Sequence, residues 1–325
     1  MIFNDSNMIS ISSLYKNIVS LSPYLEVLLR KIYWKNISFL KEYNPYKHHT
    51  SLGNSDIPHI DFDIVLNWLK KNGVKKGSLL VVHSSYEALE CTGLEAEQII
   101  EKLLDLVGPD GTLAMPVIRK FKGEPMLENL LNTSIEDLVC TYDVKKTKIV
   151  SGMLPYYLMM RDDSETSLCP LNPLCAVGSL AKEIVKDNII DDIPSPHGPN
   201  SGWKFCYDHE AIIIGLGVTL EHFNTSIHVA EEAFDNWKYS KEEWFRKRKF
   251  VIIDQNNIQF EKYIFERRPE WGMLHFAEIN LYNDLIRNNI VKSEILSGQI
   301  PVSFERSKEL VDFLRDNNKD GYPYF

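Results

Sequence analysis

The chain contains few cysteines, and none is placed as a structural cross-link or a zinc ligand usually is. Its 325 residues include five, an odd number, and no two of them form a C-x-x-C pair; they are Cys91, Cys140, Cys169, Cys175 and Cys206. A disulfide framework and a zinc ribbon both need paired cysteines, so neither is expected. We predict no metal site in this chain.

Long apolar runs are also missing. No segment is long enough and apolar enough to span a bilayer, and the opening residues M-I-F-N-D-S-N lack the charged and apolar regions of a secretory signal. The formal net charge of -9 argues against non-specific binding to nucleic acid. We therefore expect a cytoplasmic, reduced protein that neither inserts into a membrane nor binds nucleic acid.

Several motifs of nucleotide binding and catalysis are absent. The chain has no P-loop, no G-x-S-x-G nucleophile elbow and no H-E-x-x-H zinc helix. The segment Gly215-Leu216-Gly217 lacks the third glycine and the strand-to-helix context of a dinucleotide fingerprint. These absences exclude the usual sequence signatures of nucleotide-binding proteins, serine hydrolases and zinc metalloproteases.

Short apolar runs alternate with helical patterns through most of the chain. Buried strands are predicted at 78–83, 112–117 and 211–218, and helices at 62–71, 94–107, 276–289 and 304–317. Residues 238–270 predict a hairpin that turns at 255–257. This alternation is typical of an α/β fold with a central, mostly parallel or mixed sheet flanked by helices.

The first 57 residues differ from the rest in composition. Residues 11–40 are helical in pattern and carry basic and aromatic side chains, and residues 41–57 are polar and turn-rich. We predict an N-terminal helical extension with a linker over 1–57 and an α/β domain over 58–325. The extension could meet a membrane surface or a partner, but we favour a helix that packs on the body or on a second subunit.

The segment T-S-I-H-V-A-E-E at 225–232 follows the third predicted strand and is the most informative stretch of the chain. In a helix, a spacing of three residues places His228 and Glu231 on one face. A carboxylate beside an imidazole fixes its tautomer and raises its basicity, which suits proton transfer near neutral pH. Surface helices often carry such a pair without a catalytic role.

Two further clusters could carry chemistry. His83, Ser84 and Ser85 end the first predicted strand, where ligands bind in open α/β sheets, although the hydroxyls could equally cap the next turn. The Pro- and Gly-rich loop at 194–203 carries His197 and is either a substrate gate or a plain connector.

Four stretches, in this order, together resemble the aminoglycoside 3-N-acetyltransferase family. They are V-V-H-S-S-Y-E-A-L, L-V-G-P-D-G-T-L-A-M-P, S-L-C-P-L-N-P-L-C-A-V-G-S-L-A and I-I-I-G-L-G-V-T-L-E-H-F-N-T-S-I-H-V-A-E-E. The resemblance runs from about Phe62 to the C-terminus and leaves the first 57 residues outside. It implies a single α/β fold, with a homodimer as a possible assembly.

The resemblance also implies a reaction and its residues. An acetyl group would pass from the co-substrate acetyl-CoA to an amine of an amino sugar or an aminoglycoside-like compound. The resemblance places CoA near His83, Ser84, Ser85 and Thr225, and the reacting centre at His228 and Glu231. His197 is a second candidate base on chemical grounds, although relatives usually carry no histidine in its loop. We expect the acceptor amine near four further polar residues, which are Asn172, Asn188, Glu232 and Asp235.

The chain departs from the family pattern at two positions where relatives carry histidines. Cys169 replaces the histidine of an H-P pair, and Asn188, which has no basic nitrogen, replaces a candidate general base. We favour a base that has moved to His197 or His228. The alternatives are an acyl-accepting Cys169 thiol, for which a small buried hydrophobe is the commoner role, or a non-catalytic protein that binds or assembles.

Overall fold

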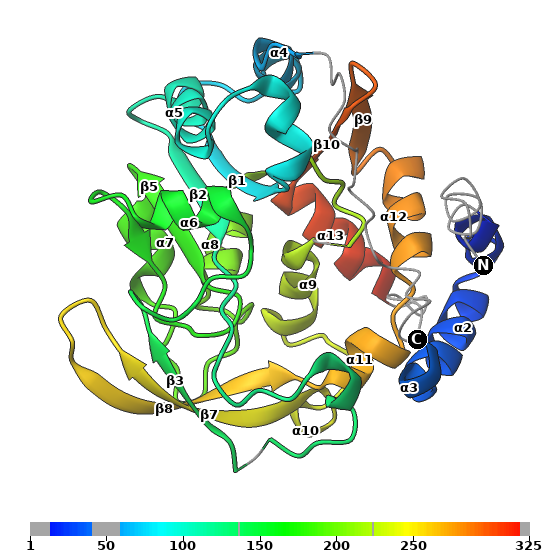
Figure 1. Ribbon diagram of the computed structural model, residues 1–325. Coiled ribbons are helices and arrows are strands. Elements are labelled where there is room, and N and C mark those ends of the chain that lie inside the picture. The colour runs from blue at the N-terminus through cyan, green and yellow to red at the C-terminus, as the bar shows by residue number, and fades with distance from the viewer. Residues whose placement is uncertain (1–13, 41–58, 136, 223, 319–325) are drawn as a thin grey trace, which may run out of the picture.

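A computed structural model of the chain describes residues 14–40, 59–135, 137–222 and 224–318. At its centre lies a seven-stranded sheet (Figure 1). In sheet order the strands are β4 (Glu165–Thr166), β5 (Leu174–Gly178), β2 (Thr112–Pro116), β1 (Leu79–Ser84), β6 (Ile212–Leu216), β10 (Ile300–Arg306) and β9 (Lys292–Leu296). The middle strands β2, β1 and β6 are parallel, and the outer pairs are antiparallel. The predicted α/β fold is confirmed, and its sheet is mixed.

The sheet is buried on both faces. This explains why β1 is apolar along its length and does not alternate between apolar and polar residues. Leu80 and Val82 point into one hydrophobic core, whereas Leu79 and Val81 point into another. Successive side chains of a strand face opposite sides, so the run L-L-V-V supplies both cores at once. This strand and the next two predicted strands are confirmed.

Helices cover both faces of the sheet (Figure 1). The core of Leu80 is closed by α4 (Asp63–Lys71), α5 (Ala96–Val107) and α6 (Met153–Met159). The core of Leu79 is closed by α7 (Ala181–Lys186), α8 (Gly202–Asp208), α9 (His228–Glu232), α12 (Glu278–Arg287) and α13 (Ser307–Asn317). The predicted helices at 62–71, 94–107 and 276–289 are confirmed to within a few residues.

The C-terminal prediction was wrong in part, because the first residues of the expected helix at 304–317 belong to β10. The segment I-P-V-S-F-E-R pairs with β6 and β9, and the helix begins only at Ser307. Strands β3, β4, β5 and β9 were not predicted either. Strands β3, β4 and β9 are short or carry polar residues, so they lack an apolar run. Strand β5 is apolar and as long as β2, so it could have been identified.

The predicted hairpin forms a second, three-stranded sheet with β3 (Val139–Asp143). Its arms are β7 (Phe245–Ile253) and β8 (Gln259–Arg267), and the backbone N–H of Asp254 donates to the carbonyl of Ile258 across the predicted turn. The short helices α10 (Lys241–Trp244) and α11 (Pro269–Leu274) flank the hairpin. It runs below the central sheet in Figure 1, and its second arm leads into α11.

The described part of the N-terminal extension packs on the body of the protein, as favoured from the sequence. It comprises a helical segment at 14–19, α2 (Pro23–Lys35) and α3 (Ile37–Leu40), and it lies beside α12 in Figure 1. The buried carboxylate of Glu26 accepts hydrogen bonds from the backbone N–H groups of Ile279 and Asn280, in the first turn of α12. It thereby caps a helix from a distant part of the chain.

The predicted linker at 41–57 lies outside the described residues. Within those residues, no helix combines the length and the apolar character that crossing a bilayer requires.

Candidate functional site

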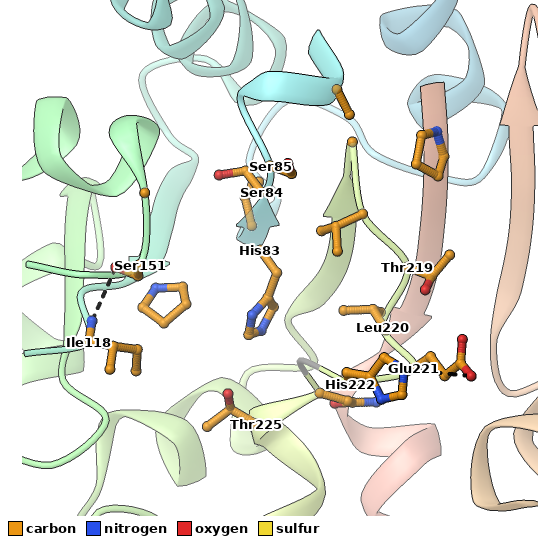
Figure 2. A pocket seen from close by; sticks show the side chains of 18 of the residues that line it. His83, Ser84, Ser85, Ile118, Ser151, Thr219, Leu220, Glu221, His222 and Thr225 are labelled. Carbon is orange, nitrogen blue, oxygen red and sulfur yellow. Dashed lines mark hydrogen bonds and ion pairs between the residues drawn. The ribbon is translucent and has the colours of Figure 1, made fainter. Parts of the chain in front are cut away.

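A cavity of about 1380 Å³ opens where the parallel strands end. Ser84 at the end of β1, Pro116 at the end of β2 and Gly217 just after β6 all line it. Carboxyl ends of parallel strands are where open α/β sheets bind ligands, since the chain reverses there and leaves a crevice. Figure 2 shows this cavity, with the end of β1 above it.

The end of β1 supplies three polar side chains to the cavity, which are His83, Ser84 and Ser85. The His83 ring stacks on Trp203 at a centroid distance of 6.0 Å, and its Nε2 has no hydrogen-bond partner among the described residues. Burial lowers the pKa of His83 to about 4, so its imidazole is neutral at pH 7. In Figure 2 the ring extends from β1 toward Thr225.

The Gly215-Leu216-Gly217 segment brings the end of β6 against the end of β1. Gly217 has φ of +72°, and a Cβ there would lie 2.4 Å from the carbonyl oxygen of Ser85. Only glycine fits that approach and that backbone conformation. The backbone N–H of Ser85 donates to the Leu216 carbonyl at 3.0 Å, which fixes the position of the serine. This segment therefore shapes the floor of the cavity.

His228 and Glu231 form the hydrogen-bonded pair that their spacing predicts. The chain makes a short 3-10 turn, η4 (Thr225–Ile227), and then enters α9, where Nδ1 of His228 lies 2.7 Å from Oε2 of Glu231. His228 lines the cavity, and the Glu231 carboxylate behind it is fully buried. A carboxylate only accepts hydrogen bonds, so the proton sits on Nδ1 and the lone pair on Nε2.

Arg267 is a third member of this group, and sequence reasoning missed it. Its Nη1 lies 2.9 Å from Nδ1 of His228 and 3.4 Å from Oε2 of Glu231, and the residue lines the cavity. A guanidinium only donates hydrogen bonds, and Nδ1 of His228 is itself a donor to Glu231, so Arg267 cannot bond to Nδ1. The favourable partner of Arg267 is the Glu231 carboxylate. Arg267 is the last residue of β8, and only the folded hairpin brings it here.

The surroundings of His228 keep its imidazole neutral. Burial lowers the pKa of His228, the Arg267 guanidinium lowers it further, and Glu231 opposes both effects. The result is a pKa below the usual histidine value, with a free lone pair at pH 7. Such an imidazole can accept a proton, and the adjacent carboxylate stabilises the cation that forms.

His197 lies directly behind His228, at a ring-centroid distance of 5.0 Å, but it is not among the residues that line the cavity. Its Nε2 is 3.2 Å from Nδ2 of Asn172, and its Nδ1 is 3.3 Å from Oε2 of Glu232. Burial raises the pKa of Glu232, but the facing His197, His228 and Arg267 bring it below the usual value. His197 and Glu232 thus form a buried pair that supports α9.

The remaining residues expected near the acceptor lie away from the cavity lining. Asn188 is buried, accepts from the Ser167 hydroxyl at 2.5 Å, and donates to the Ile184 carbonyl at 2.8 Å. Asn172 and Glu232 hold His197, and Asp235 is exposed just after the end of α9. Acceptor binding by these four residues stays a prediction.

Cys169, which replaces a family histidine, is buried in a hydrophobic core that it shares with residues of the three-stranded sheet. Its thiol donates to the Leu171 carbonyl at 3.5 Å, and burial raises its pKa to about 12. A thiol in such a setting is rarely ionised and is a poor nucleophile. Among the described residues, no three His, Cys, Asp or Glu side chains cluster closely enough to hold a metal ion.

Comparisons with known proteins identify the family and the fold of the chain. The family model of aminoglycoside 3-N-acetyltransferases matches residues 81–317. Aminoglycoside N(3)-acetyltransferase IX of Micromonospora chalcea is 25% identical over 190 residues, which cover 56% of this chain and 62% of that protein. The chain thus spans less than two thirds of the length of that curated relative.

Solved structures share the fold at low sequence identity. The structure of AAC-IIIb in a binary complex with CoASH superposes with a TM-score of 0.64 at 16% identity, over 81% of this chain and 97% of that one. The YokD protein from Bacillus subtilis gives a TM-score of 0.62 at 20% identity, over 82% and 96% of the two chains. With a family match that spans most of the sequence, the cavity and its His–Glu pair are features of a protein that belongs to the aminoglycoside 3-N-acetyltransferase family.

Proposed function

We propose that the protein is a CoA-dependent N-acyltransferase, which moves an acetyl group from acetyl-CoA to an amine of an amino sugar or aminoglycoside-like acceptor. One observation carries the proposal: the cavity joins the hydroxyls of Ser84 and Ser85 to the His228–Glu231 pair. Acyl transfer to an amine needs these two functions, an acceptor of a proton and donors for an oxyanion, in one site.

His228 acts as the general base in this proposal. Its Nε2 takes a proton from the acceptor amine while the amine nitrogen attacks the thioester carbonyl carbon. The tetrahedral intermediate then collapses, the carbon–sulfur bond breaks, and the imidazolium returns the proton to the CoA sulfur. Glu231 holds the ring in the correct tautomer throughout and stabilises its cationic form, because its Oε2 bonds Nδ1 at 2.7 Å.

Ser84 and Ser85 are the proposed donors to the oxyanion. Both line the cavity, and neither hydroxyl has a hydrogen-bond partner in the part of the chain that the structure describes. The backbone N–H of Ser85 is already bonded to Leu216, so the hydroxyls rather than that amide are available. One well-placed donor of this kind changes the rate about 10²- to 10³-fold.

The size of the cavity supports two substrates. At about 1380 Å³ it exceeds the roughly 300–1,000 Å³ of an ordinary small-molecule pocket, so it has room for a pantetheine arm and an acceptor together. Among the structural neighbours, AAC-IIIb was solved with CoASH, and AAC(3)-IVa with a gentamicin and with apramycin. Holding the amine against the thioester supplies much of the acceleration.

A non-catalytic protein that binds or assembles is the competing function. The His228–Glu231 pair opens on the cavity, unlike the buried His197–Glu232 pair behind it, and this exposure to the substrate space favours the enzyme. The two candidate functions differ in their dependence on His228. A binding or assembly protein would tolerate His228→Ala without loss of its cellular role.

The test begins with titration calorimetry of the full chain with acetyl-CoA and with desulfo-CoA, a mimic without the reactive sulfur. We expect saturable binding of both with dissociation constants of about 1–100 μM, or roughly 5–8 kcal/mol. Amino-sugar acceptors are then screened for the mass increase of one acetyl group. His209→Ala, at an exposed histidine that follows α8, is the matched control for His228→Ala. Absence of CoA binding, or equal turnover by the two variants, would contradict the proposal.

A further inference from the structure

The N-terminal extension contributes a side chain to the cavity, although it lies outside the residues 81–317 that match the family model. Lys16 lines the cavity, and its Nζ lies 2.8 Å from Oε2 of Glu221. The Glu221 side chain is 9% exposed and that of Lys16 is 45% exposed. The carboxylate thus belongs to the cavity wall, and the lysine reaches over it from outside.

A second cation of the extension neutralises a second wall carboxylate. Arg30 lies 2.8 Å from Oε2 of Glu278, which also lines the cavity. Burial raises the pKa of Glu278, but Arg30 and His222 outweigh it and bring the value to about 2, so the carboxylate is ionised. His222 stands between the two carboxylates, 3.3 Å from Glu278 and 3.7 Å from Glu221.

Figure 2 shows where this charged group lies in the cavity. Glu221 and His222 sit at the opposite side of the view from Ile118 and Ser151, on the segment that leads from β6 to Thr225. Residues 217–222 and 224–225 line the cavity on the stretch of chain that leads to His228, so the charged group and the candidate base belong to one continuous wall.

The extension is fixed in place by buried polar contacts. Nδ2 of Asn280 donates to the Val19 carbonyl at 2.9 Å and to Oε2 of Glu26 at 2.7 Å. Nη2 of Arg30 donates to the Gly272 carbonyl at 2.9 Å. Such bonds are costly to break because each leaves a buried polar group unsatisfied. Lys16 is therefore held at the cavity by the packing of the whole segment.

We propose that Lys16 is a specificity-determining residue of this cavity, which disfavours acceptors with several ammonium groups. It occupies Glu221, the carboxylate that would otherwise attract a second cation of such an acceptor. The preferred acceptor is an amino sugar whose only cation is the reacting amine and whose remainder is neutral or anionic. This inference rests on the proposed function, because it assigns the acceptor of that same site.

The test measures binding of gentamicin, a polycation, and of glucosamine, with a single amine, to the full chain by titration calorimetry without acyl donor. We expect Lys16→Ala to tighten gentamicin binding about tenfold, which corresponds to roughly 1.4 kcal/mol, and to change glucosamine binding less than about twofold. The gain should shrink in high salt, since the cavity is open to solvent. Lys35→Ala, at an exposed lysine of α2, is the matched control and should change neither affinity.

A double-mutant cycle locates the effect. If the gain passes through Glu221, Glu221→Gln should abolish it in the Lys16→Ala background. Equal gentamicin affinity of the wild type and Lys16→Ala, or a gain that persists in the double variant, overturns the inference. Neither result bears on CoA binding or turnover. Conversely, the affinities could change as expected while no acetyl transfer is found. That result would support the selectivity of the cavity and refute the proposed function.

Discussion

His197 and His228 lie with their ring centroids 5.0 Å apart, but only His228 lines the cavity. The two histidines are thus neighbours in different surroundings. His228 pairs with Glu231 and faces the substrate space, whereas His197 pairs with Glu232 inside the protein. Sequence reasoning left open which histidine is the base, and the geometry favours His228.

We predict that His228→Ala lowers kcat/KM for acetyl transfer about 10²- to 10⁴-fold, because it removes the proton acceptor. The measurement is release of the CoA thiol in the presence of an acceptor that the mass screen identifies. His209→Ala should behave as the wild type, and thermal unfolding should show that both variants are folded. A His228→Ala protein with nearly full activity would exclude this residue as the base.

His197→Ala should act mainly on stability. It removes the imidazole that lies 3.3 Å from the Glu232 carboxylate and 3.2 Å from the Asn172 amide, although the backbone N–H of residue 197 still donates to Glu232. Leaving the partly buried Asn172 amide without its partner costs about 1–3 kcal/mol. We expect a clear fall in the free energy of unfolding, measured with urea, and a smaller loss of kcat/KM than in His228→Ala. The reverse order of the two losses in kcat/KM would assign the base to His197.

Arg267→Gln should shift the pH dependence of the reaction. The guanidinium lowers the pKa of His228, so its removal raises that pKa and leaves more of the imidazole protonated at a given pH. The acid limb of kcat/KM should therefore move to higher pH, and an NMR titration should show the same displacement for the His228 ring. Arg268→Gln, at the next residue, is the control. An unchanged acid limb would show that Arg267 does not act on His228.

Glu305 should make the stability of the protein depend on pH. Its Oε2 accepts from Nδ2 of Asn224 at 2.8 Å, and its Oε1 lies 3.3 Å from the Ser226 hydroxyl. That hydroxyl has one proton for two acceptors, Oε1 of Glu305 at 3.3 Å and Oδ1 of Asn224 at 2.8 Å. When it donates to the nearer Asn224, a protonated Glu305 completes the ring by donating to the hydroxyl. Burial raises the pKa of Glu305 to about 8, which agrees with a neutral acid at pH 7.

The sign of the effect follows from the direction of the shift. The folded state holds this proton up to a pKa of about 8, whereas the unfolded chain releases it near 4.5. The contribution of Glu305 to stability is therefore fully present below pH 4.5, and it is lost as the pH rises through about 8. Glu305→Gln keeps the hydrogen-bonded ring but has no ionisable group at this position. The melting temperature of this variant should therefore fall less with rising pH than that of the wild type. A wild type and a variant with parallel profiles between about pH 6 and 9 would refute the neutral acid.

Cys169→Ala should leave acetyl transfer nearly unchanged, because the thiol is buried, away from the cavity, with a pKa raised to about 12. We expect kcat/KM within about threefold of the wild type and a loss of roughly 1 kcal/mol in stability from the smaller side chain. Mass spectrometry after a burst with acetyl-CoA should find no acetyl group on Cys169. An acetylated Cys169 peptide would revive the thiol mechanism.

Local pattern was enough for the elements that are apolar on their own. The run L-L-V-V in β1 is buried on both faces, so it could be identified without knowledge of its partners. The spacing of His228 and Glu231 predicted their contact, since a helix places residues three apart on one face. By contrast, the strand character of β10 comes from pairing with β6 and β9, which a single segment does not reveal.

The sequence by itself therefore determined the α/β class, the His–Glu pair and the strand end that bears Ser84 and Ser85, because each depends on neighbouring residues along the chain. Only the tertiary structure decided that Arg267 meets His228, that His197 lies behind the cavity lining, and that Lys16 reaches Glu221. These contacts join residues from 31 to 205 positions apart in the numbering, and chain folding rather than local periodicity brings such residues together. The protonation that we infer for His228 and the selectivity that we propose for the cavity both depend on these contacts, so they are properties of the fold.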